Sequence, residues 1–521
     1  MLLEKIQKEN DIKQLKPEEL EKLAEEIRQF LVEKISVTGG HLASNLGVVE
    51  LTMALHLAFE LPQDKMIWDV GHQSYTHKIL TGRRAGFDDL RKYGGMSGFP
   101  KRKESECDAF DTGHSSTSIS AGLGYVAARD IKGEEHSVIS IIGDGAMTGG
   151  MAYEALNNAS RLKSNFIIVL NDNNMSISEN VGGMSRYLNG LRTAEAYTGL
   201  KKGVEDTLMK IPVQGEKILY QMKKTKSGLK QLFVPGMFFE DMGITYLGPV
   251  DGHDIRKLYK TFQEAKRVDH AVLVHVLTKK GKGYVPAEEN PSRFHGIVPF
   301  DIETGEAKEK SSKDSYTDIF SKVFCDIAKQ NDAVVGITAA MADGTGLARF
   351  ARMFPDRFFD VGIAEEHALT FAAGLAAGGL KPVVAVYSSF LQRAFDQTIH
   401  DVCLQNLPVM IAVDRAGLVG SDGETHQGLF DLSFLNMIPN MTILSPKNRW
   451  EMADMVRFCA DFQYPVALRY PRGAAYEGLS AFRTPIVYGK SEILYEEEDI
   501  AVIFVGHMAE LAVQVRDRLK E

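Results

Sequence analysis

Residues 137–170 read SVISIIGDGAMTGGMAYEALNNASRLKSNFIIVL, and this stretch decides the fold class. It opens with the β-branched run Ser137–Ile142, passes through the turn GDGAMTGG and a helical pattern near Met151–Arg161, and ends in the apolar run Phe166–Leu170. Two apolar strands joined by a helix form the βαβ unit of a parallel sheet that is buried on both faces. The sequence therefore predicts an α/β protein.

The same rhythm of strands and helices continues on both sides of this unit. Pro17 suits a first helical position, and apolar residues then recur at helical spacing up to Leu31. The roughly 60 residues after Ser178 are polar and Lys-rich, and we interpret them as an excursion over the first domain. The polar segment Ala307–Ser315 is typical of an interdomain linker. Later strands are expected at Ala333–Thr338, Pro382–Phe390, Pro408–Asp414, Met441–Ser445, Pro465–Tyr470 and Ile500–Gly506.

These shifts predict the domain organisation. A chain of 521 residues is too long for one hydrophobic core. We expect successive doubly wound, mostly parallel-sheet domains at residues 1–306 and 307–480, followed by a third at 481–521 that contains only the beginning of its fold.

Composition narrows the class of protein. Charged residues make up 25% of the chain and the net charge is −9 without long blocks, which argues against nucleic acid or an anionic membrane as a partner. The first residues lack the apolar core of a signal peptide, and the longest apolar runs are shorter than the ~20 residues of a membrane span. Four distant cysteines indicate neither a disulfide scaffold nor a zinc site. We expect a cytoplasmic protein.

Polar residues follow both strands of the βαβ unit. Asp144 comes after the first strand and Asn173 after the second, so both are expected at the carboxyl edge of the sheet. A carboxylate, an amide oxygen and a backbone carbonyl, here that of Met175, are hard ligands that suit Mg²⁺ together with diphosphate oxygens. The alternative is structural, with Asp144 as a helix N-cap and Asn173 in a turn.

A series of ordered motifs gives a closer resemblance. GDG followed by an Asn about thirty residues later is similar to the diphosphate-and-magnesium signature of thiamine-dependent enzymes. From about Gly39 to Gly473 the chain resembles the 1-deoxy-D-xylulose-5-phosphate synthase family of the transketolase superfamily. The resemblance is carried by GHLASNLGVVELT, WDVGHQSYTHKILTGRR, DTGHSSTSISAGLG, IGDGAMTGGMAYEALNNA, NDNNMSISENVGG, GPVDGHD, TKKGKGYVPAE, DVGIAEEHALTFAAGLA, YSSFLQRAFDQ, DRAGLVGSDGETHQG and RYPRG.

This resemblance implies a transketolase-like fold and a reaction. With thiamine diphosphate and Mg²⁺, the enzyme would decarboxylate pyruvate and join the remaining two carbons to D-glyceraldehyde 3-phosphate. The product feeds isoprenoid and thiamine biosynthesis. It also implies a homodimer whose active site is completed within one chain. Two rival hypotheses remain: a transketolase that moves a ketol unit between sugars, and a non-catalytic thiamine-binding paralogue.

Roles for single residues follow from the same resemblance. Glu365 in IAEEH would hydrogen-bond the aminopyrimidine ring and activate the cofactor. Its neighbour Glu366, where many relatives carry Gln, has no assigned role and is more simply an exposed acid at a helix start. Further cofactor contacts are implied for His72, Gly113, His114, Ser115, Gly145, Ala146, Asn173 and Tyr284.

The resemblance also assigns the substrate side. His41, His295 and His426 match histidines of substrate binding or proton transfer, a task that suits imidazole near neutral pH. Guanidinium groups bind phosphate well, and Arg393 and Arg472 match the phosphate ligands of the family. Tyr387 and Asp422 would shape the acceptor pocket. Arg102 and Lys280 are candidates for the cation near pyruvate, and Lys279 could take the place of Lys280.

Overall fold

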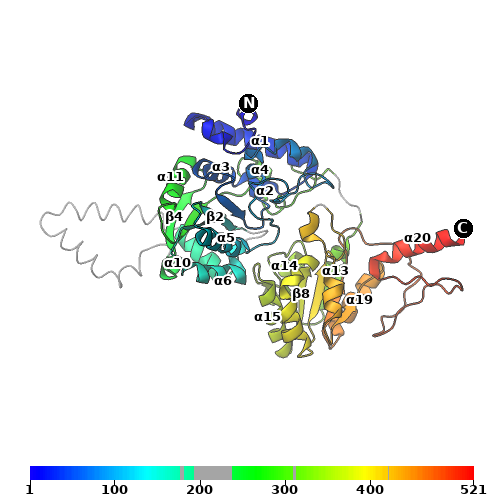
Figure 1. The fold of residues 1–521 in the computed structure, drawn as a ribbon. Helices are drawn as coiled ribbons and strands as arrows, with labels where there is room; N and C mark the ends of the chain where they lie inside the picture. Colours follow the sequence, from blue (N-terminus) through cyan, green and yellow to red (C-terminus); the bar gives the residue numbers. More distant parts are fainter. Residues whose placement is uncertain (176–180, 193–236, 309–312, 421) are drawn as a thin grey trace. The chain divides into compact units, whose positions relative to one another are not determined.

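The computed structural model describes residues 1–175, 181–192, 237–308, 313–420 and 422–521. The chain divides into two compact units, Met1–Lys308 and Glu309–Glu521 (Figure 1). Each unit is built around one parallel sheet. No helix among the described residues is long and apolar enough to cross a membrane.

The sheet of the first unit has the strand order β1-β2-β3-β5-β4, with every pair parallel. Because all strands run the same way, the residues that follow each strand gather at one carboxyl edge. The strands are β1 (Lys65–Trp68), β2 (Val138–Gly143), β3 (Phe166–Asp172), β4 (Thr245–Asp251) and β5 (Ala271–Leu277).

Helices cover both faces of this sheet. Alternate residues of one strand enter different cores: Ile139 and Ile141 pack on one face, whereas Val138 and Ile142 pack on the other. This two-sided burial explains why the strand is a continuous apolar run. The first face is covered by α1 (Leu20–Thr38), α3 (Val49–Ala58) and α11 (Ile255–Ala265), and the second by α5 (Ser118–Lys132), α6 (Gly150–Ala159) and α10 (Met237–Asp241).

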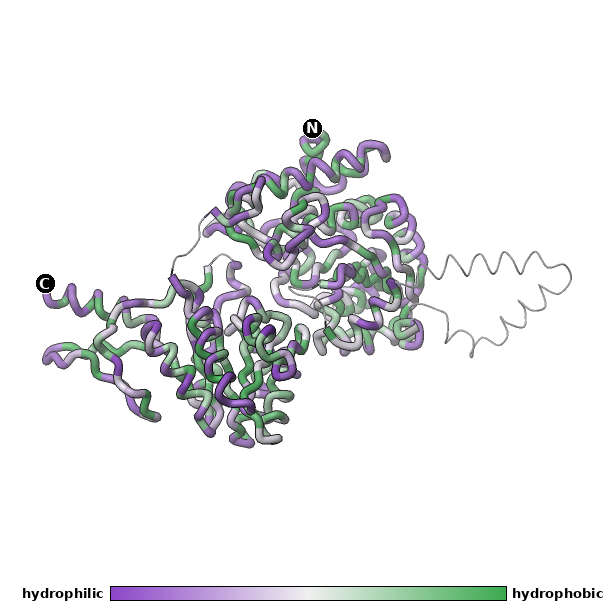
Figure 2. Tube along the Cα trace, turned by 180° about the vertical axis from the view of Figure 1, so that it is seen from behind, coloured by the Kyte–Doolittle hydropathy of each residue, from purple (hydrophilic) through white to green (hydrophobic). Residues whose placement is uncertain are grey.

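Three short helices on the carboxyl side of the strands contribute to the core of the first face. They are α2 (Leu42–Leu46), α4 (Tyr75–Leu80) and α12 (Val285–Glu289). Along the N-terminal helices, hydrophilic and hydrophobic residues alternate, as one-sided burial requires (Figure 2).

The second unit repeats the plan with the strand order β10-β11-β9-β8-β6-β7, again all parallel. The chain leaves β6 for β7 on one side and returns to β8 on the other, so the strand order reverses between β6 and β8. Ligands of open α/β sheets bind at such a point. The strands are β6 (Val334–Thr338), β7 (Phe358–Asp360), β8 (Lys381–Tyr387), β9 (Met410–Asp414), β10 (Thr442–Leu444) and β11 (Val466–Arg469).

Helices again lie on both faces. One core contains residues of α13 (Tyr316–Ala328), α14 (Ala348–Met353) and α19 (Arg449–Asp461). The opposite core contains residues of α15 (Glu365–Ala377), α16 (Ser388–Leu391) and α18 (Asp431–Asn436). Two further α-helices among the described residues are α17 (Phe395–Gln397) and α20 (Ala509–Lys520).

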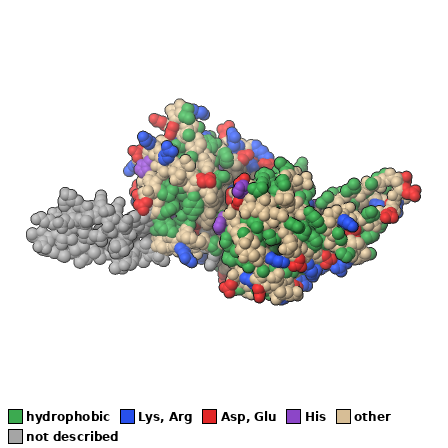
Figure 3. Space-filling model, turned by 90° about the horizontal axis from the view of Figure 1, so that it is seen from below, with side chains coloured by type: hydrophobic (Ala, Val, Ile, Leu, Met, Phe, Trp, Pro, Cys, Tyr) green, Lys and Arg blue, Asp and Glu red, His purple; other side chains and the backbone are tan. Residues whose placement is uncertain are grey.

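The predicted helix after Pro17 and all but one of the named strands are confirmed, with strand ends that move by at most three residues. The strand predicted at Ile500–Gly506 is wrong: residues 500–505 have no regular secondary structure. Their side chains are largely exposed, Ile503 to 92%, and no described strand pairs with them. A parallel strand needs a neighbour for its backbone hydrogen bonds, so an apolar run alone does not form one. Figure 3 shows hydrophobic side chains on the surface near the C-terminus. The excursion after Ser178 lies mostly outside the described residues.

Candidate active site

Asp144 and Asn173 lie at the same edge of the first sheet, as predicted. Gly143 pairs with Asn171 across β2 and β3, and the Asp144 N–H donates to the Asn171 carbonyl at 3.1 Å. The amide oxygen of Asn173 accepts the N–H of Met175 at 3.1 Å and so shapes the turn after β3. The three residues predicted to bind metal therefore follow two hydrogen-bonded strands.

Asp144 is buried and carries a carboxylate oxygen, Oδ2, that accepts no hydrogen bond from a described residue. Burial raises the pKa of this carboxyl to about 6, while the Arg192 charge opposes the rise. Buried polar atoms are nearly always paired, so an oxygen that is not hydrogen-bonded needs an explanation. A hard cation at this oxygen is one, and the residues at this edge fit Mg²⁺.

Arg192 is a residue at this edge that sequence reasoning missed. Its Nε donates to Asp172 Oδ2 at 2.8 Å, and its Nη2 lies 3.6 Å from Asp144 Oδ2. Behind it, His275 Nε2 lies 2.9 Å from Asp172 Oδ2, and burial lowers the pKa of His275 to about 4. The edge thus already attracts one cation. Among the described residues, no group of three or more His, Cys, Asp or Glu side chains could hold a metal. The predicted ligand set is of another kind, because Asp144 is its only member of these residue types.

Three predicted histidines gather on the same side of the first unit. The ring of His41 lies 5.5 Å from His72 and 5.9 Å from His295, and the rings of His72 and His295 are 5.0 Å apart. Lys280 Nζ lies 3.3 Å from His295 Nδ1. Burial, and then the Lys280 charge, hold the pKa of His295 well below its usual range, so this ring is neutral at pH 7. Burial lowers the pKa of Lys280 to about 8, and the charge of Asp144 opposes that shift.

The structure also separates the two candidate lysines. Lys280 is buried beside His295, whereas the side chain of Lys279 is 60% exposed and pairs with Glu288. Lys280 is therefore the lysine whose side chain contacts His295.

The segment that carries Gly113, His114 and Ser115 is held against the GDG turn. Asp69, one residue after β1, accepts the N–H groups of Ser116 and Ser118 at 2.7 and 3.0 Å. The Ser116 hydroxyl donates to the carbonyl of Ala146 at 2.8 Å, which joins the segment to the residue after Gly145.

Gly71, just before His72, shows why this turn needs glycine. Its φ is +86°, and a Cβ there would lie 2.3 Å from Pro100 and Thr112. A larger residue would therefore displace both the turn and its neighbours.

Two other predicted residues of this unit are placed differently. The Tyr284 hydroxyl donates to the Ile302 carbonyl at 2.7 Å, and its ring packs on Phe294 and Phe300. Arg102 is exposed on a loop, and its backbone N–H donates to Asp111 at 2.6 Å.

Glu365 begins α15 in the second unit, where a helix N-terminus favours an acid. Its side chain is buried, and Oε2 accepts no hydrogen bond from a described residue. Arg393 Nη1 lies 3.9 Å from this oxygen. Burial raises the pKa of Glu365 to about 7, and Arg393 opposes the rise. A carboxyl of this kind fits an N–H donor of a ring such as aminopyrimidine.

The predicted acceptor residues follow strands of the same sheet. Tyr387 ends β8 and stacks on Phe390, whose ring lies 5.5 Å from that of His426. Burial raises the pKa of Tyr387 to about 12, with smaller effects of neighbouring charges that include Arg472 and Asp422. His426 accepts or donates a 2.8 Å hydrogen bond with the Thr425 hydroxyl.

Arg415 and Asp414 are further residues here that sequence reasoning missed. The Arg415 guanidinium lies 3.8 Å from the centre of the Tyr387 ring. Burial raises the pKa of Asp414 to about 6, opposed first by the Thr317 hydroxyl and also by the charges of Arg415 and Arg472. Asp414 ends the buried strand β9 and Arg415 directly follows it, a signal that could have singled them out.

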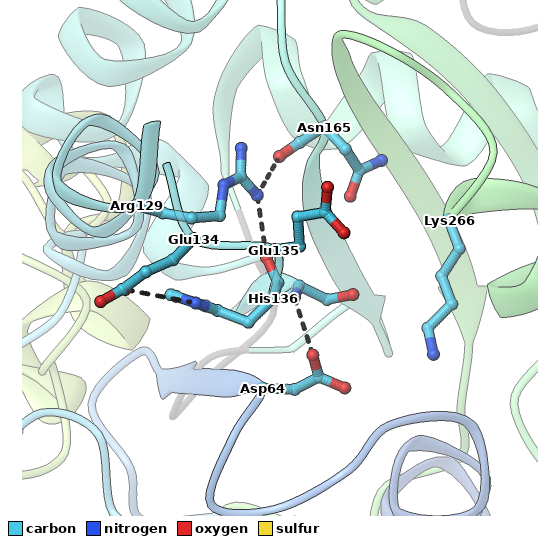
Figure 4. Close-up of a pocket in the computed structure, with 8 residues that line it drawn as sticks. Asp64, Arg129, Glu134, Glu135, His136, Asn165 and Lys266 are labelled. Carbon is cyan, nitrogen blue, oxygen red and sulfur yellow. Dashed lines mark hydrogen bonds and ion pairs between the residues drawn. The ribbon is translucent and has the colours of Figure 1, made fainter. Parts of the chain in front are cut away.

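A cavity of about 480 Å³ opens at the opposite, amino edge of the first sheet. Figure 4 shows Asp64, Arg129, Asn165 and Lys266 around it. None of the predicted site residues lines this cavity, and Asp64 and Arg129 use their polar atoms in hydrogen bonds to the protein. We assign it no function.

Two family models match this chain. Residues 3–278 match the family model of 1-deoxy-D-xylulose-5-phosphate synthase, and residues 312–477 match the transketolase pyrimidine-binding domain. The second match covers the sheet of the second unit, which confirms the predicted transketolase-like α/β fold. A solved transketolase from Campylobacter jejuni is 18% identical, over 87% of this chain and 78% of that chain, with a TM-score of 0.41.

Curated relatives are much more similar. The 1-deoxy-D-xylulose-5-phosphate synthase of Lachnoclostridium phytofermentans is 60% identical over 99% of this chain and 83% of its own length. Synthases of Caldanaerobacter subterraneus and Clostridium acetobutylicum are 55% and 54% identical, over 100% and 99% of this chain and 83% and 84% of their own lengths. Thiamine diphosphate is the cofactor that this transketolase-type family implies. The chain belongs to the 1-deoxy-D-xylulose-5-phosphate synthase family.

Proposed function

We propose that this chain makes 1-deoxy-D-xylulose 5-phosphate and CO₂ from pyruvate and D-glyceraldehyde 3-phosphate, with thiamine diphosphate and Mg²⁺ bound. One observation carries the proposal beyond family membership. Asp144 and Glu365 are both buried, and each has an oxygen that accepts no hydrogen bond from a described residue. Such atoms are costly unless a ligand uses them.

The first unit would hold the charged end of the cofactor. Asp144, Asn173 and the Met175 carbonyl would bind Mg²⁺, and through it the diphosphate. Contacts to the cofactor would come from the segments that Asp69 and Ser116 hold together, and from the turn before α4; these residues are His72, Gly113, His114, Ser115, Gly145 and Ala146. Tyr284, just before α12, would contact the cofactor from a separate segment.

Bound thiamine diphosphate would supply the electron sink that decarboxylation of pyruvate requires. Glu365 would accept an N–H of its aminopyrimidine ring and hold a proton there. The pKa of about 7 supports this role, because a carboxyl is most useful in proton transfer when its pKa is near the working pH.

The substrates would be held by cations and histidines. Lys280 and Arg102 would pair with the carboxylate of pyruvate, and His41 and His295 would move a proton at its C2 oxygen. Arg393 and Arg472 would bind the phosphate of the acceptor, with Tyr387, Asp422 and His426 beside its carbonyl group. A homodimer and a cytoplasmic location belong to the same proposal.

A turnover assay tests this function against its rivals. The chain is mixed with Mg²⁺, thiamine diphosphate, pyruvate and glyceraldehyde 3-phosphate, and both CO₂ and deoxyxylulose phosphate are measured. A transketolase would release no CO₂ from pyruvate and would use ketose phosphates instead. A non-catalytic paralogue would bind the cofactor and form neither product.

A further inference from the structure

Asn45 lies beneath the histidines of the first unit, in α2. It is fully buried. Its Nδ2 donates to the carbonyl oxygens of His41 at 2.6 Å and His72 at 2.7 Å, and its Oδ1 accepts the N–H of Tyr75 at 2.7 Å. One side chain thus joins three backbone positions that are up to 34 residues apart in the chain.

Each of these positions bears on the histidine cluster. His41 and His72 carry two of its rings, 5.5 Å apart. The Tyr75 hydroxyl lies 3.3 Å from the backbone nitrogen of His41 and 3.4 Å from its Nδ1. Asn45 therefore fixes the main chain of His41, of His72 and of Tyr75, whose hydroxyl contacts His41.

The backbone of α2 reaches the other two members of the cluster. The Ala43 N–H donates to the Phe294 carbonyl at 3.0 Å, next to His295, and the Ala43 carbonyl accepts the Gly281 N–H at 2.9 Å, next to Lys280. Helix α2 is thus bonded to the backbone of His41 and His72 through the Asn45 side chain, and to the neighbours of His295 and Lys280 through the Ala43 backbone.

We propose that Asn45 is a positioning residue, which sets the relative placement of the His41 and His72 rings for the reaction of the proposed function, on which this inference rests. The carboxamide is suited to the task because it has two donors and one acceptor oxygen in a fixed plane. No residue with a single hydroxyl can donate to both carbonyls. A displacement of about 1 Å at a catalytic group is enough to slow a reaction about a hundredfold.

The first unit contains a matched control. Asn165 Nδ2 also donates to two backbone carbonyls, those of Ala265 at 2.9 Å and Val268 at 2.8 Å. It lies beside the amino-edge cavity (Figure 4), at the opposite end of the sheet from the histidines. Replacing Asn165 removes the same kind of bonds without touching the cluster.

The test compares Asn45→Ala and Asn45→Asp with Asn165→Ala and Asn165→Asp in the full chain. Asn45→Asp keeps the volume and the acceptor for Tyr75 and replaces both donors by a carboxyl oxygen, and Asn165→Asp controls for the carboxyl that is introduced. Ring ¹⁵N NMR of histidine-labelled protein is recorded without cofactor, with signals assigned from His41→Gln and His72→Gln. Steady-state kinetics with saturating cofactor and thermal unfolding complete the set.

We expect both Asn45 variants to shift the ring signals of His41 and His72 and to lower kcat about tenfold to a hundredfold. The Asn165 variants should leave those signals in place and change kcat less than about twofold at a similar loss of thermal stability. Unchanged ring signals in folded Asn45→Asp, or equal losses of kcat in both pairs, would overturn the proposal. If His41→Gln and His72→Gln themselves turn over normally while Asn45→Asp still shifts the rings, the histidine roles in the proposed function fail and the positioning by Asn45 stands.

Discussion

Replacing Glu365 by Gln should make the cofactor-free chain more stable at alkaline pH. With the cofactor bound, the same replacement should slow the reaction. The pKa of Glu365 is raised from its ordinary 4.5 to about 7, first by burial. The folded chain therefore binds this proton more tightly than the unfolded chain does. Stability is lost as the pH rises from about 4.5 to about 7, by about 3 kcal/mol in total. Glutamine has the same shape and does not ionise, so the variant lacks this loss.

Denaturant unfolding of wild type and Glu365→Gln, without cofactor, measures the effect. We subtract the free energy of unfolding of wild type from that of Glu365→Gln at each pH. Between about pH 4.5 and pH 8 this difference should rise by up to about 3 kcal/mol, in favour of the variant. Glu366→Gln is the control, because the half-buried neighbouring acid loses the same charge. A difference that does not change with pH, or one that Glu366→Gln reproduces, would refute the reasoning.

Glu365→Gln should still bind thiamine diphosphate, but the C2 proton of the bound cofactor should exchange slowly. Loss of a positioned acid–base group costs about a hundredfold or more. Quenched-flow NMR in D₂O measures this exchange directly. Exchange near the wild-type rate would show that Glu365 does not activate the cofactor.

Four further predictions concern other residues. Asp144→Ala should abolish Mg²⁺-dependent binding of thiamine diphosphate in calorimetry while the fold remains, and an unchanged affinity would contradict the metal role. Lys280→Met should raise KM for pyruvate about tenfold or more, whereas Lys279→Met, at an exposed ion pair, should change it little. Arg472→Met should mainly weaken use of the phosphorylated acceptor. Arg393→Met should also slow pyruvate decarboxylation, because Arg393 lies 3.9 Å from Glu365. An equal loss of activity with an unphosphorylated aldehyde would contradict the phosphate role of both arginines. Co-expressed Asp144→Ala and Glu365→Ala chains should show no recovered activity in verified mixed dimers, and activity near half of wild type would show that two chains share each site.

Local pattern predicts the strands whose residues are apolar on both faces. Val138–Gly143 and Phe166–Asp172 are nearly all buried, so the run of β-branched residues was sufficient. Strand Phe358–Asp360 has only three residues, too few to leave a period. Strand Thr245–Asp251 contains a Gly-Pro pair and a shift of register against its neighbour, which disguise it as a turn.

The strand predicted at Ile500–Gly506 fails for the opposite reason. Its sequence has the right composition, but a strand is completed by its neighbour and not by its own residues. The strand order of each sheet is likewise a long-range property that composition does not contain.

The candidate site shows the same division. The positions of Asp144 and Asn173 at one edge follow from two strand ends, and the structure places them there. Asn45 and Arg192 could not be singled out, because their partners come from segments that are distant in sequence. Their role depends on the meeting of those segments, which only the fold reveals.

The most direct test of the proposed function follows carbon from pyruvate to product. The chain is incubated with [2,3-¹³C₂]pyruvate, D-glyceraldehyde 3-phosphate, thiamine diphosphate and Mg²⁺, and ¹³C NMR is combined with measurement of CO₂. We expect one CO₂ for each deoxyxylulose phosphate, with both labelled carbons at C1 and C2 of the sugar, and loss of both products when Mg²⁺ is chelated. Release of no CO₂, or label that appears in no sugar phosphate, would contradict the proposed function.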